Sequence, residues 1–213
     1  MTKTIILIPS RLAATRLPNK PLLKINDISI INHVYLKAIS SKIGDVFVAT
    51  GDKEIFEEVR KIDGKCVLTE KEHQTGTDRI FEAYQKLGIK DVDYIINLQG
   101  DEPMIDIEDI KNLNNSAIKN KSEIATLACK IKDKKIFNKS NVVKVITDEK
   151  ISMEKMSRAN TFSRVVSSND NSNIYHHIGI YIYKVSILEK FVNLKQTKNE
   201  IDQRLEQLRA FDN

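Results

Sequence analysis

The sequence has no tryptophan, and its 213 residues include only two cysteines, four prolines and seven glycines. The two thiols, Cys66 and Cys129, provide neither a disulfide framework nor the ligand spacing of a zinc site. Each lies in an apolar run, so we expect both to be buried core residues of a protein from a reducing compartment. The cysteine usage therefore predicts a cytoplasmic protein.

Long hydrophobic runs are also missing. The first apolar stretch, residues 5–8, is too short for the hydrophobic region of a signal peptide, and no segment approaches the roughly 20 apolar residues of a membrane helix. The net charge of +5 is spread as single lysines rather than gathered in a basic block. Small polyanionic substrates, such as a nucleotide triphosphate and an acidic sugar, would explain local positive charge as well as nucleic acid would. We therefore expect a protein that binds neither membranes nor nucleic acid.

Short apolar runs alternate with helical patterns over the first hundred residues. The expected strands are 5–8, 45–50, 66–68 and 94–98, and the expected helices cover 30–38, 55–59 and 80–87, the last beginning near Thr77 and Asp78. This alternation predicts a parallel sheet flanked by helices, in which ligands bind at the carboxyl ends of the strands. The later strands, 125–131, 142–147 and 174–183, alternate more, which indicates a mixed extension of the sheet or a small lobe.

A basic, proline-spaced loop follows the first strand at residues 9–21 (PSRLAATRLPNKP). Its Arg11, Arg16 and Lys20 can surround a triphosphate, because arginine grips two phosphate oxygens at once and lysine acts as a point charge. A solvated basic loop is the alternative. The position of the loop at the end of a strand favours phosphate binding.

A glycine flanked by threonines precedes a helical pattern at residues 73–79 (HQTGTDR). Gly76 lets the backbone approach a ligand closely, and a helix N-terminus points its N–H groups at that ligand. An ordinary helix cap explains the same pattern equally well.

A carboxylate follows the fourth expected strand at residues 99–103 (QGDEP). Asp101, held between a glycine and a proline, suits Mg²⁺, which takes one or two protein carboxylates and completes its shell with substrate phosphates. A turn aspartate without a ligand is the alternative.

Together these segments resemble the Kdo (3-deoxy-manno-octulosonate) cytidylyltransferase family, also called the CMP-Kdo synthetase family. Its signature Pro-Ala-Arg-x-x-Ser-Thr-Arg-Leu-Pro-x-Lys-Pro-Leu differs here only at Ser10 and Ala14. The resemblance implies catalytic roles for Arg11, Lys20 and Asp101, with Asp101 as the metal ligand. The CTP contacts that it implies are Pro9, Ser10, Arg11, Lys20, Gln74, Thr75, Gly76 and Thr77.

Further family motifs follow at 157–159 (SRA), 177–183 (HIGIYIY) and 205–209 (LEQLR). Without the family, the histidine reads as structural and LEQLR as the solvated face of a charged helix over 200–209. The resemblance implies that Arg158 pairs with the carboxylate of the sugar. The sugar contacts that it implies besides Arg158 are Gln99, His177, Glu206 and Gln207.

The resemblance also implies a fold and a reaction. The fold is α/β, a three-layer Rossmann-like nucleotide-diphospho-sugar transferase fold in which residues 1–213 form one domain with a mostly parallel sheet. A small lobe at about 125–183 is expected to make a homodimer. The implied reaction is attack by the anomeric hydroxyl of Kdo on the α-phosphate of CTP, with Mg²⁺ as cofactor, giving CMP-Kdo and pyrophosphate for lipopolysaccharide biosynthesis.

Family members continue past LEQLR with a Gly-Val-Asp-(Thr/Ser)-Pro-Glu-Asp-Leu segment, whose first aspartate is a second metal ligand. This sequence contains no such string. We therefore expect slow turnover and exposed side chains at Ile201, Leu205 and Leu208. Two alternatives stay open: a related acidic sugar such as 8-amino-Kdo or a nonulosonic acid, and a truncated homologue that binds CTP or a partner subunit with little catalysis.

Overall fold

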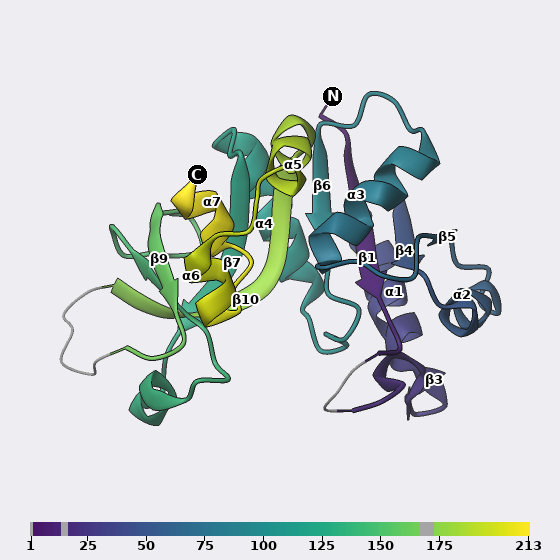
Figure 1. The fold of residues 1–213 in the computed structure, drawn as a ribbon, viewed down its shortest axis with the longest axis horizontal. Helices are drawn as coiled ribbons and strands as arrows, with labels where there is room; N and C mark the ends of the chain where they lie inside the picture. The colour runs from purple at the N-terminus through teal and green to yellow at the C-terminus, as the bar shows by residue number, and fades with distance from the viewer. Residues whose placement is uncertain (1, 14–16, 167–172) are drawn as a thin grey trace. The chain divides into compact units, whose positions relative to one another are not determined.

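The computed structural model describes residues 2–13, 17–166 and 173–213, which form two compact units (Figure 1). Unit 1 comprises Met1–Ala125 and Ile180–Val192, and unit 2 comprises Thr126–Gly179 and Asn193–Asn213. Each unit is described by itself. The expected arrangement of one domain with a dimerisation lobe at about 125–183 stays a prediction.

Unit 1 is built on parallel strands, as the apolar runs predicted. The strands are β1 (Thr4–Ser10), β4 (Val46–Thr50), β5 (Cys66–Leu68) and β6 (Tyr94–Asn97), in the order β5-β4-β1-β6. Strand β10 (Asn173–Lys184) enters both units, and its last residues pair antiparallel with β6, Tyr181 opposite Asn97. Strands β1, β4 and β6 are buried on both faces, which is why they read as continuous apolar runs rather than as alternating ones, whereas the edge strand β5 is only partly buried.

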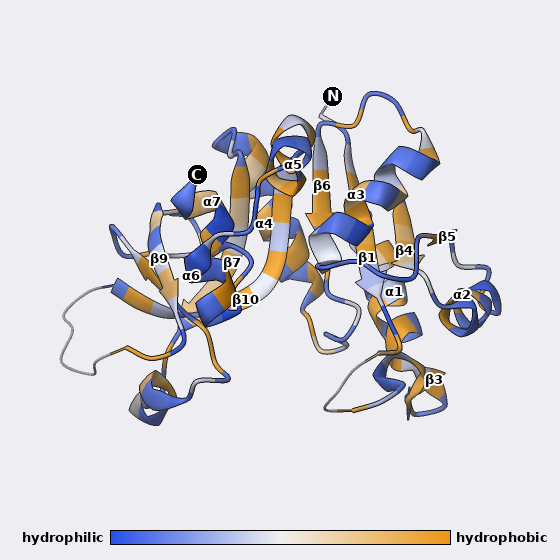
Figure 2. Cartoon of the chain, viewed as in Figure 1, coloured by the Kyte–Doolittle hydropathy of each residue, from blue (hydrophilic) through white to orange (hydrophobic). Residues whose placement is uncertain are grey.

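Helices cover both faces of this sheet. They are α1 (Ile30–Ser40), α2 (Lys53–Arg60), α3 (Gly76–Leu87), α4 (Ile107–Lys119) and α5 (Val185–Val192). Leu7 of β1 packs with Ile80 of α3 and Leu188 of α5, whereas α1 contacts β1 and β4 and packs beside α2 and α4. Figure 2 shows the strands largely hydrophobic and the helices with mixed surfaces. The predicted three-layer α/β architecture is confirmed.

A small hairpin that the sequence patterns did not predict follows the basic loop. A 3-10 turn, η1 (Lys20–Leu22), leads into β2 (Lys24–Ile25) and β3 (Ile28–Ser29). Asn26 and Asp27 between the strands both have positive φ angles, 48° and 65°. Asparagine and aspartate tolerate this conformation, which two-residue hairpin turns require.

Unit 2 has an antiparallel sheet with two short helices. Its elements, besides the first part of β10, are β7 (Ile124–Lys130), η2 (Lys134–Asn138), β8 (Lys144–Thr147), β9 (Ala159–Ser163), α6 (Lys198–Gln203) and α7 (Leu208–Asp212). Strand β8 lies between β9 and β10. The core of the unit gathers Val145, Phe162, Tyr175, Leu205 and Leu208.

The expected helix over 200–209 is wrong. Arg204 adopts a left-handed conformation (φ 53°) and ends α6, and α7 begins only at Leu208. Because the chain turns here, Leu205 and Leu208 both reach the core, where each is 5% exposed. Of the three side chains expected to be exposed, only Ile201 is, at 57%.

The burial expected for both cysteines is wrong for Cys129. That residue lies near the end of β7, where the side chains are exposed, and its Sγ is 3.8 Å from Nδ1 of His176. Cys66 is half-buried in β5, and burial raises the pKa of its thiol to about 12. Within the described residues, neither cysteine forms a disulfide.

The described helices include none that is long and apolar enough to cross a membrane.

Candidate functional site

The strand order of unit 1 reverses at β1. After β1 the chain adds β4 and then β5 on one side and places β6 on the other side. The loops that leave the carboxyl ends of β1 and β6 therefore diverge at a topological switch point, where sheets of this kind bind ligands. The predicted phosphate loop follows β1, and the predicted metal-binding turn follows β6.

Pro9 is the point where the three predicted nucleotide segments meet. A Cβ built on Gly76 would lie 3.2 Å from Pro9 Cγ, and one built on Gly100 would lie 2.9 Å from the Pro9 carbonyl oxygen. The Cβ built on Gly100 would also lie 3.3 Å from Ser10 Cβ. Pro9 and Ser10 are buried beneath these contacts. The two glycines thus allow the start of α3 and the turn after β6 to lie against the end of β1.

Lys20 and Asp101 connect the basic loop to the turn after β6. Lys20 Nζ lies 2.7 Å from Asp101 Oδ2, and the two side chains are 33% and 52% exposed. Asn19, in a left-handed conformation (φ 55°), precedes η1 and sets the start of that turn. The structure thus brings together a predicted phosphate cation and the predicted metal ligand, 81 residues apart in the sequence.

The remaining charged groups of these loops are solvent-accessible. Arg11 is exposed, and the next amide, Leu12 N–H, donates to Asp52 Oδ2 over 2.8 Å, which anchors the loop to the end of β4. The Glu102 side chain is exposed, but neighbouring atoms partly desolvate its carboxyl, and this desolvation, followed by the charge of Asp101, raises its pKa. Arg16, the other predicted phosphate ligand, lies outside the described residues.

The N-terminus of α3 has a capping box. The Thr75 hydroxyl accepts from Asp78 N–H (3.1 Å) and lies 2.8 Å from Asp78 Oδ2. The cap thus begins two residues before the expected start. The helix-cap interpretation of residues 73–79 is confirmed, and the ligand interpretation stays a prediction. Buried Thr77 accepts from Asn97 Nδ2 (3.3 Å), and Gln99 Nε2 donates to Asn97 Oδ1 (3.4 Å). Gln74 is exposed just before the cap.

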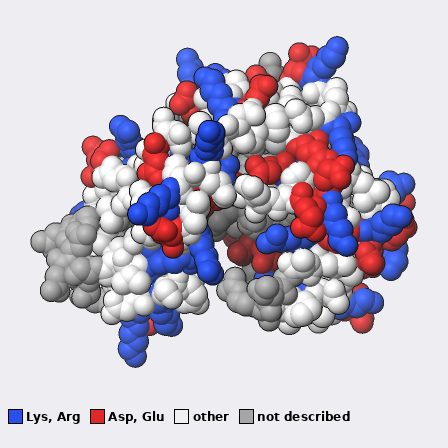
Figure 3. All heavy atoms as spheres, in the orientation of Figure 1, with Lys and Arg blue, Asp and Glu red and all other residues white. Residues whose placement is uncertain are grey.

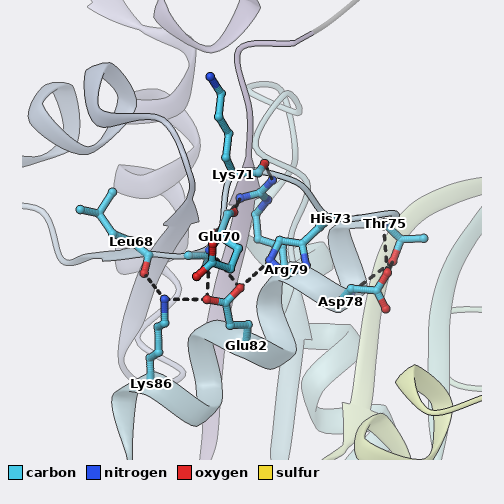
Figure 4. Close-up of polar contacts among 10 residues, drawn as sticks. Leu68, Glu70, Lys71, His73, Thr75, Asp78, Arg79, Glu82 and Lys86 are labelled. Atoms are coloured by element: carbon cyan, nitrogen blue, oxygen red, sulfur yellow. Dashed lines mark hydrogen bonds and ion pairs between the residues drawn. The ribbon is translucent and has the colours of Figure 1, made fainter.

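Sequence reasoning missed two residues beside this cap, Arg79 and Glu82 of α3. Figure 4 shows both side chains reaching back to the segment that precedes the helix. Arg79 donates to three oxygens of that segment, and Glu82 accepts from it. Their spacing from Thr75, four and seven residues, is the signal that they share one helix face.

The predicted sugar ligands other than Gln99 belong to unit 2. Arg158 is exposed immediately before β9. His177 is 9% exposed and meets the Phe162 ring edge-on at 4.9 Å between centroids. Burial, and then the charge of His176, lower the pKa of His177 to about 4.

Thr126 lies beside the ring of His177. Its hydroxyl oxygen is 3.0 Å from Nε2 of His177 and 3.1 Å from the Ile178 carbonyl oxygen. Burial of the ring, which lowers its pKa, favours the neutral imidazole.

Glu206 and Gln207 lie in the turn between α6 and α7 rather than on a continuous helix, and both are half-buried. Arg164 supports the turn, because Nε donates to the Gln203 carbonyl (2.6 Å) and Nη2 to the Arg204 carbonyl (2.9 Å). The pattern alone did not indicate this support.

The positions of charged side chains and of possible metal ligands among the described residues bear on which ligands can bind. Figure 3 shows positive and negative side chains interspersed over the face that it presents. No cluster of three or more His, Cys, Asp or Glu that could hold a metal is found in the described ranges. Asp101, in the turn after β6 and with its side chain 52% exposed, stays a predicted metal ligand.

Comparison with known proteins agrees with this geometry. The family model described as cytidylyltransferase matches residues 5–213. A 3-deoxy-manno-octulosonate cytidylyltransferase of Thermodesulfovibrio yellowstonii is 41% identical over 99% of this chain and 86% of its own length. One from Brucella ovis is 38% identical over 99% and 84%.

Similarity to a solved structure extends to the whole fold. CMP:2-keto-3-deoxy-manno-octonic acid synthetase complexed with CTP aligns with a TM-score of 0.88 and 33% identity, over 99% of this chain and 86% of the other. The match covers both units described above. The chain therefore belongs to the cytidylyltransferase family.

Proposed function

We propose that this protein transfers CMP from CTP to the anomeric hydroxyl of 3-deoxy-manno-octulosonate, releasing pyrophosphate. The observation that carries the proposal is the convergence of three segments on Pro9, with Lys20 and Asp101 2.7 Å apart beside it. Relatives that match 99% of the chain bear the name of this activity. The solved relative holds CTP.

The reaction exchanges one P–O bond for another. The anomeric oxygen bonds to the α-phosphorus of CTP, and the bond from that phosphorus to the α,β-bridging oxygen breaks. Pyrophosphate leaves with the electron pair, and the hydroxyl proton passes to solvent. Such transfers depend mainly on positioning and on neutralising charge. Arg11 and Lys20 supply positive charge at the triphosphate, and the N-terminus of α3 supplies N–H donors at Gly76 and Thr77.

Mg²⁺ is the proposed cofactor, and Asp101 would hold it. The donor chemistry fits, because Mg²⁺ uses one or two carboxylates together with phosphate oxygens, and the Asp101 carboxylate already lies 2.7 Å from a cation. Bound there, the metal would neutralise phosphate charge and favour deprotonation of the attacking hydroxyl.

The proposed sugar contacts follow from the character of each side chain. Arg158, exposed and cationic, would pair with the sugar carboxylate. Gln99, Glu206 and Gln207 would exchange hydrogen bonds with hydroxyls, and His177 would contribute its neutral ring. These assignments rest on the sequence motifs.

Three broader assignments complete the proposal. The product would serve lipopolysaccharide biosynthesis. Two cysteines that form no disulfide within the described residues, together with a nucleotide substrate, support a cytoplasmic location. A homodimer through residues 125–183 is also proposed, on the family resemblance, and light scattering at micromolar concentration tests it.

A turnover assay tests the central proposal. Pyrophosphate release is measured with CTP, Mg²⁺ and the sugar, with UTP and sugar-free reactions as controls. We expect release that needs both CTP and the sugar, because the exocyclic amine of cytosine is a donor where uracil has an acceptor. Equal rates with UTP, or none with CTP, contradict it.

The same assay separates the alternatives. Turnover with 8-amino-Kdo or a nonulosonic acid, but not with Kdo, moves the assignment to a related sugar. Calorimetric CTP binding without turnover on any of these sugars indicates a binding protein with little catalysis.

A further inference from the structure

The segment Thr69–Thr75 connects β5 to α3 and carries the predicted nucleotide contacts Gln74 and Thr75. The structure assigns it no helix or strand. It lies against the end of β4, because Thr69 N–H donates to the Thr50 carbonyl (2.9 Å). A Cβ on Gly51 would lie 2.5 Å from Lys71 Cα, so the contact leaves no room for a side chain. One side of the segment is thus fixed by the sheet.

Arg79 holds the other side of the segment. Its guanidinium is buried (3% exposed) and donates Nη1 to Thr69 Oγ1 (2.6 Å) and to the Glu70 carbonyl (3.0 Å). Nη2 donates to the Lys71 carbonyl at 3.0 Å. Three consecutive residues of an irregular segment therefore depend on one side chain. The planar guanidinium presents these donors from two nitrogens held in a fixed geometry, whereas lysine has a single donor nitrogen.

Glu82, one turn further along α3, contacts the same segment at two points. Its carboxylate accepts from Glu70 N–H (3.0 and 3.1 Å) and lies 2.5 Å from His73 Nε2. Lys86, the next residue on this face, lies 2.6 Å from Glu82 Oε1 and donates to the Leu68 carbonyl at 3.1 Å. Figure 4 shows these contacts side by side. A single face of α3 carries Thr75, Arg79, Glu82 and Lys86. Their side chains make the hydrogen bonds that a neighbouring strand would make if the segment belonged to a sheet.

We propose that Arg79 and Glu82 are positioning residues for the nucleotide site: they hold Thr69–His73 between α3 and the end of β4, and so set where Gln74 and the N-terminus of α3 meet CTP. This inference rests on the proposed function. His73 is bonded to Glu82 on one side and adjoins Gln74 on the other, so freeing it releases the first predicted nucleotide contact.

A change in the dissociation constant for CTP separates this role from general stabilisation of the fold. Loss of a hydrogen bond to a charged group lets the segment sample positions in which Gln74 is displaced. Small displacements of residues in such sites have large effects on function. We expect CTP binding to weaken roughly tenfold in Glu82→Gln and in Arg79→Lys. A merely structural role would lower the fraction of folded protein without changing the dissociation constant of the folded part.

The experiment measures CTP affinity by calorimetry, in which the stoichiometry reports the folded fraction. Glu58→Gln is the matched control, because Glu58 of α2 pairs with Lys61, the residue directly after that helix (2.8 Å), and is 17% exposed against 19% for Glu82. Amide hydrogen exchange of residues 69–77 without nucleotide is recorded for each protein. We expect faster exchange there in both α3 variants and not in the control.

The outcomes are distinct. Tenfold weaker CTP binding in the two α3 variants, with Glu58→Gln within twofold of wild type, supports the positioning role. Binding within twofold of wild type in all variants overturns it and leaves the proposed function intact. Equal weakening in Glu58→Gln also overturns it. Wild-type protein that binds no CTP contradicts the proposed function itself.

Discussion

Arg209 and Glu200 form a buried two-point ion pair that ties α7 to the start of α6. Nε lies 2.9 Å from Oε2 and Nη2 lies 2.6 Å from Oε1, and the side chains are 2% and 4% exposed. Burial raises the pKa of Glu200, but bonds from Arg209 and Gln196 together lower it below its ordinary value. The pair closes the turn that carries Glu206 and Gln207.

Breaking this pair on one side should destabilise unit 2 strongly. Glu200→Gln or Arg209→Met leaves a buried charge without its partner, and we expect a loss of about 3–5 kcal/mol in the free energy of unfolding. The double variant should lose less than the sum of the two. Urea unfolding measures this, with Lys155→Met as control, because the Lys155–Glu149 pair is exposed and is worth at most about 1 kcal/mol. Additive losses would contradict the coupling.

Gly100 should matter for activity more than for folding. A methyl group in Gly100→Ala would lie 2.9 Å from the Pro9 carbonyl, so the turn bearing Asp101 must move. A shift of about 1 Å can reduce the rate by roughly 10²-fold, and we expect kcat/KM to fall by 10- to 100-fold. The control is Gly88→Ala, where the space is open but φ is +59°. That variant should lose about 1 kcal/mol of stability and keep its kinetics; the reverse pattern would contradict the assignment.

Much of unit 1 could be predicted from the sequence because its strands β1, β4 and β6 are buried on both faces. The runs at 5–8, 45–50 and 94–98 have no other interpretation at that length, and the motifs follow directly from their ends. The proximity of Lys20 and Asp101 then follows from topology, because adjacent parallel strands end at one edge.

The parts that could not be predicted depend on tertiary contacts. Glu82 and Lys86 have the spacing of an ordinary solvated ion pair, and only the fold shows the segment beneath them. The break at Arg204 has no glycine or proline to mark it, since burial of Leu205 and Leu208 outweighs the left-handed conformation of one residue. Local propensity cannot show this balance.

Unit 2 should lose stability as the pH falls, because of His177. Its pKa of about 4 in the folded protein lies below its ordinary value of 6.5, so the unfolded chain binds the proton first. Stability is therefore complete above pH 6.5 and declines between 6.5 and 4, by about 3 kcal/mol in all. His177→Gln should flatten this decline, and thermal unfolding across the pH range measures it, with His33→Gln in unit 1 as a control. An NMR titration that places the His177 midpoint near 6.5 would refute the argument.

Replacing Lys20 should have opposite effects on the binding of the metal and of CTP. Its ammonium lies 2.7 Å from Asp101 Oδ2, where a metal bound by that carboxylate would also lie, so lysine and metal compete when no nucleotide is present. In Lys20→Met the competing charge is gone and Mn²⁺ binding without CTP should tighten. CTP binding should weaken by about 1.5–3 kcal/mol, because a charge-assisted phosphate contact is lost.

Electron paramagnetic resonance of Mn²⁺ and calorimetry of CTP measure the two effects. The control is Lys65→Met, because the Lys65–Asp45 pair has the same 2.7 Å separation and lies outside the proposed site. It should change neither affinity. If Mn²⁺ and CTP both bind more weakly in Lys20→Met, the lysine supports the metal site instead of competing for it. If neither changes, Lys20 is only a surface partner of Asp101, and the phosphate role passes to Arg11.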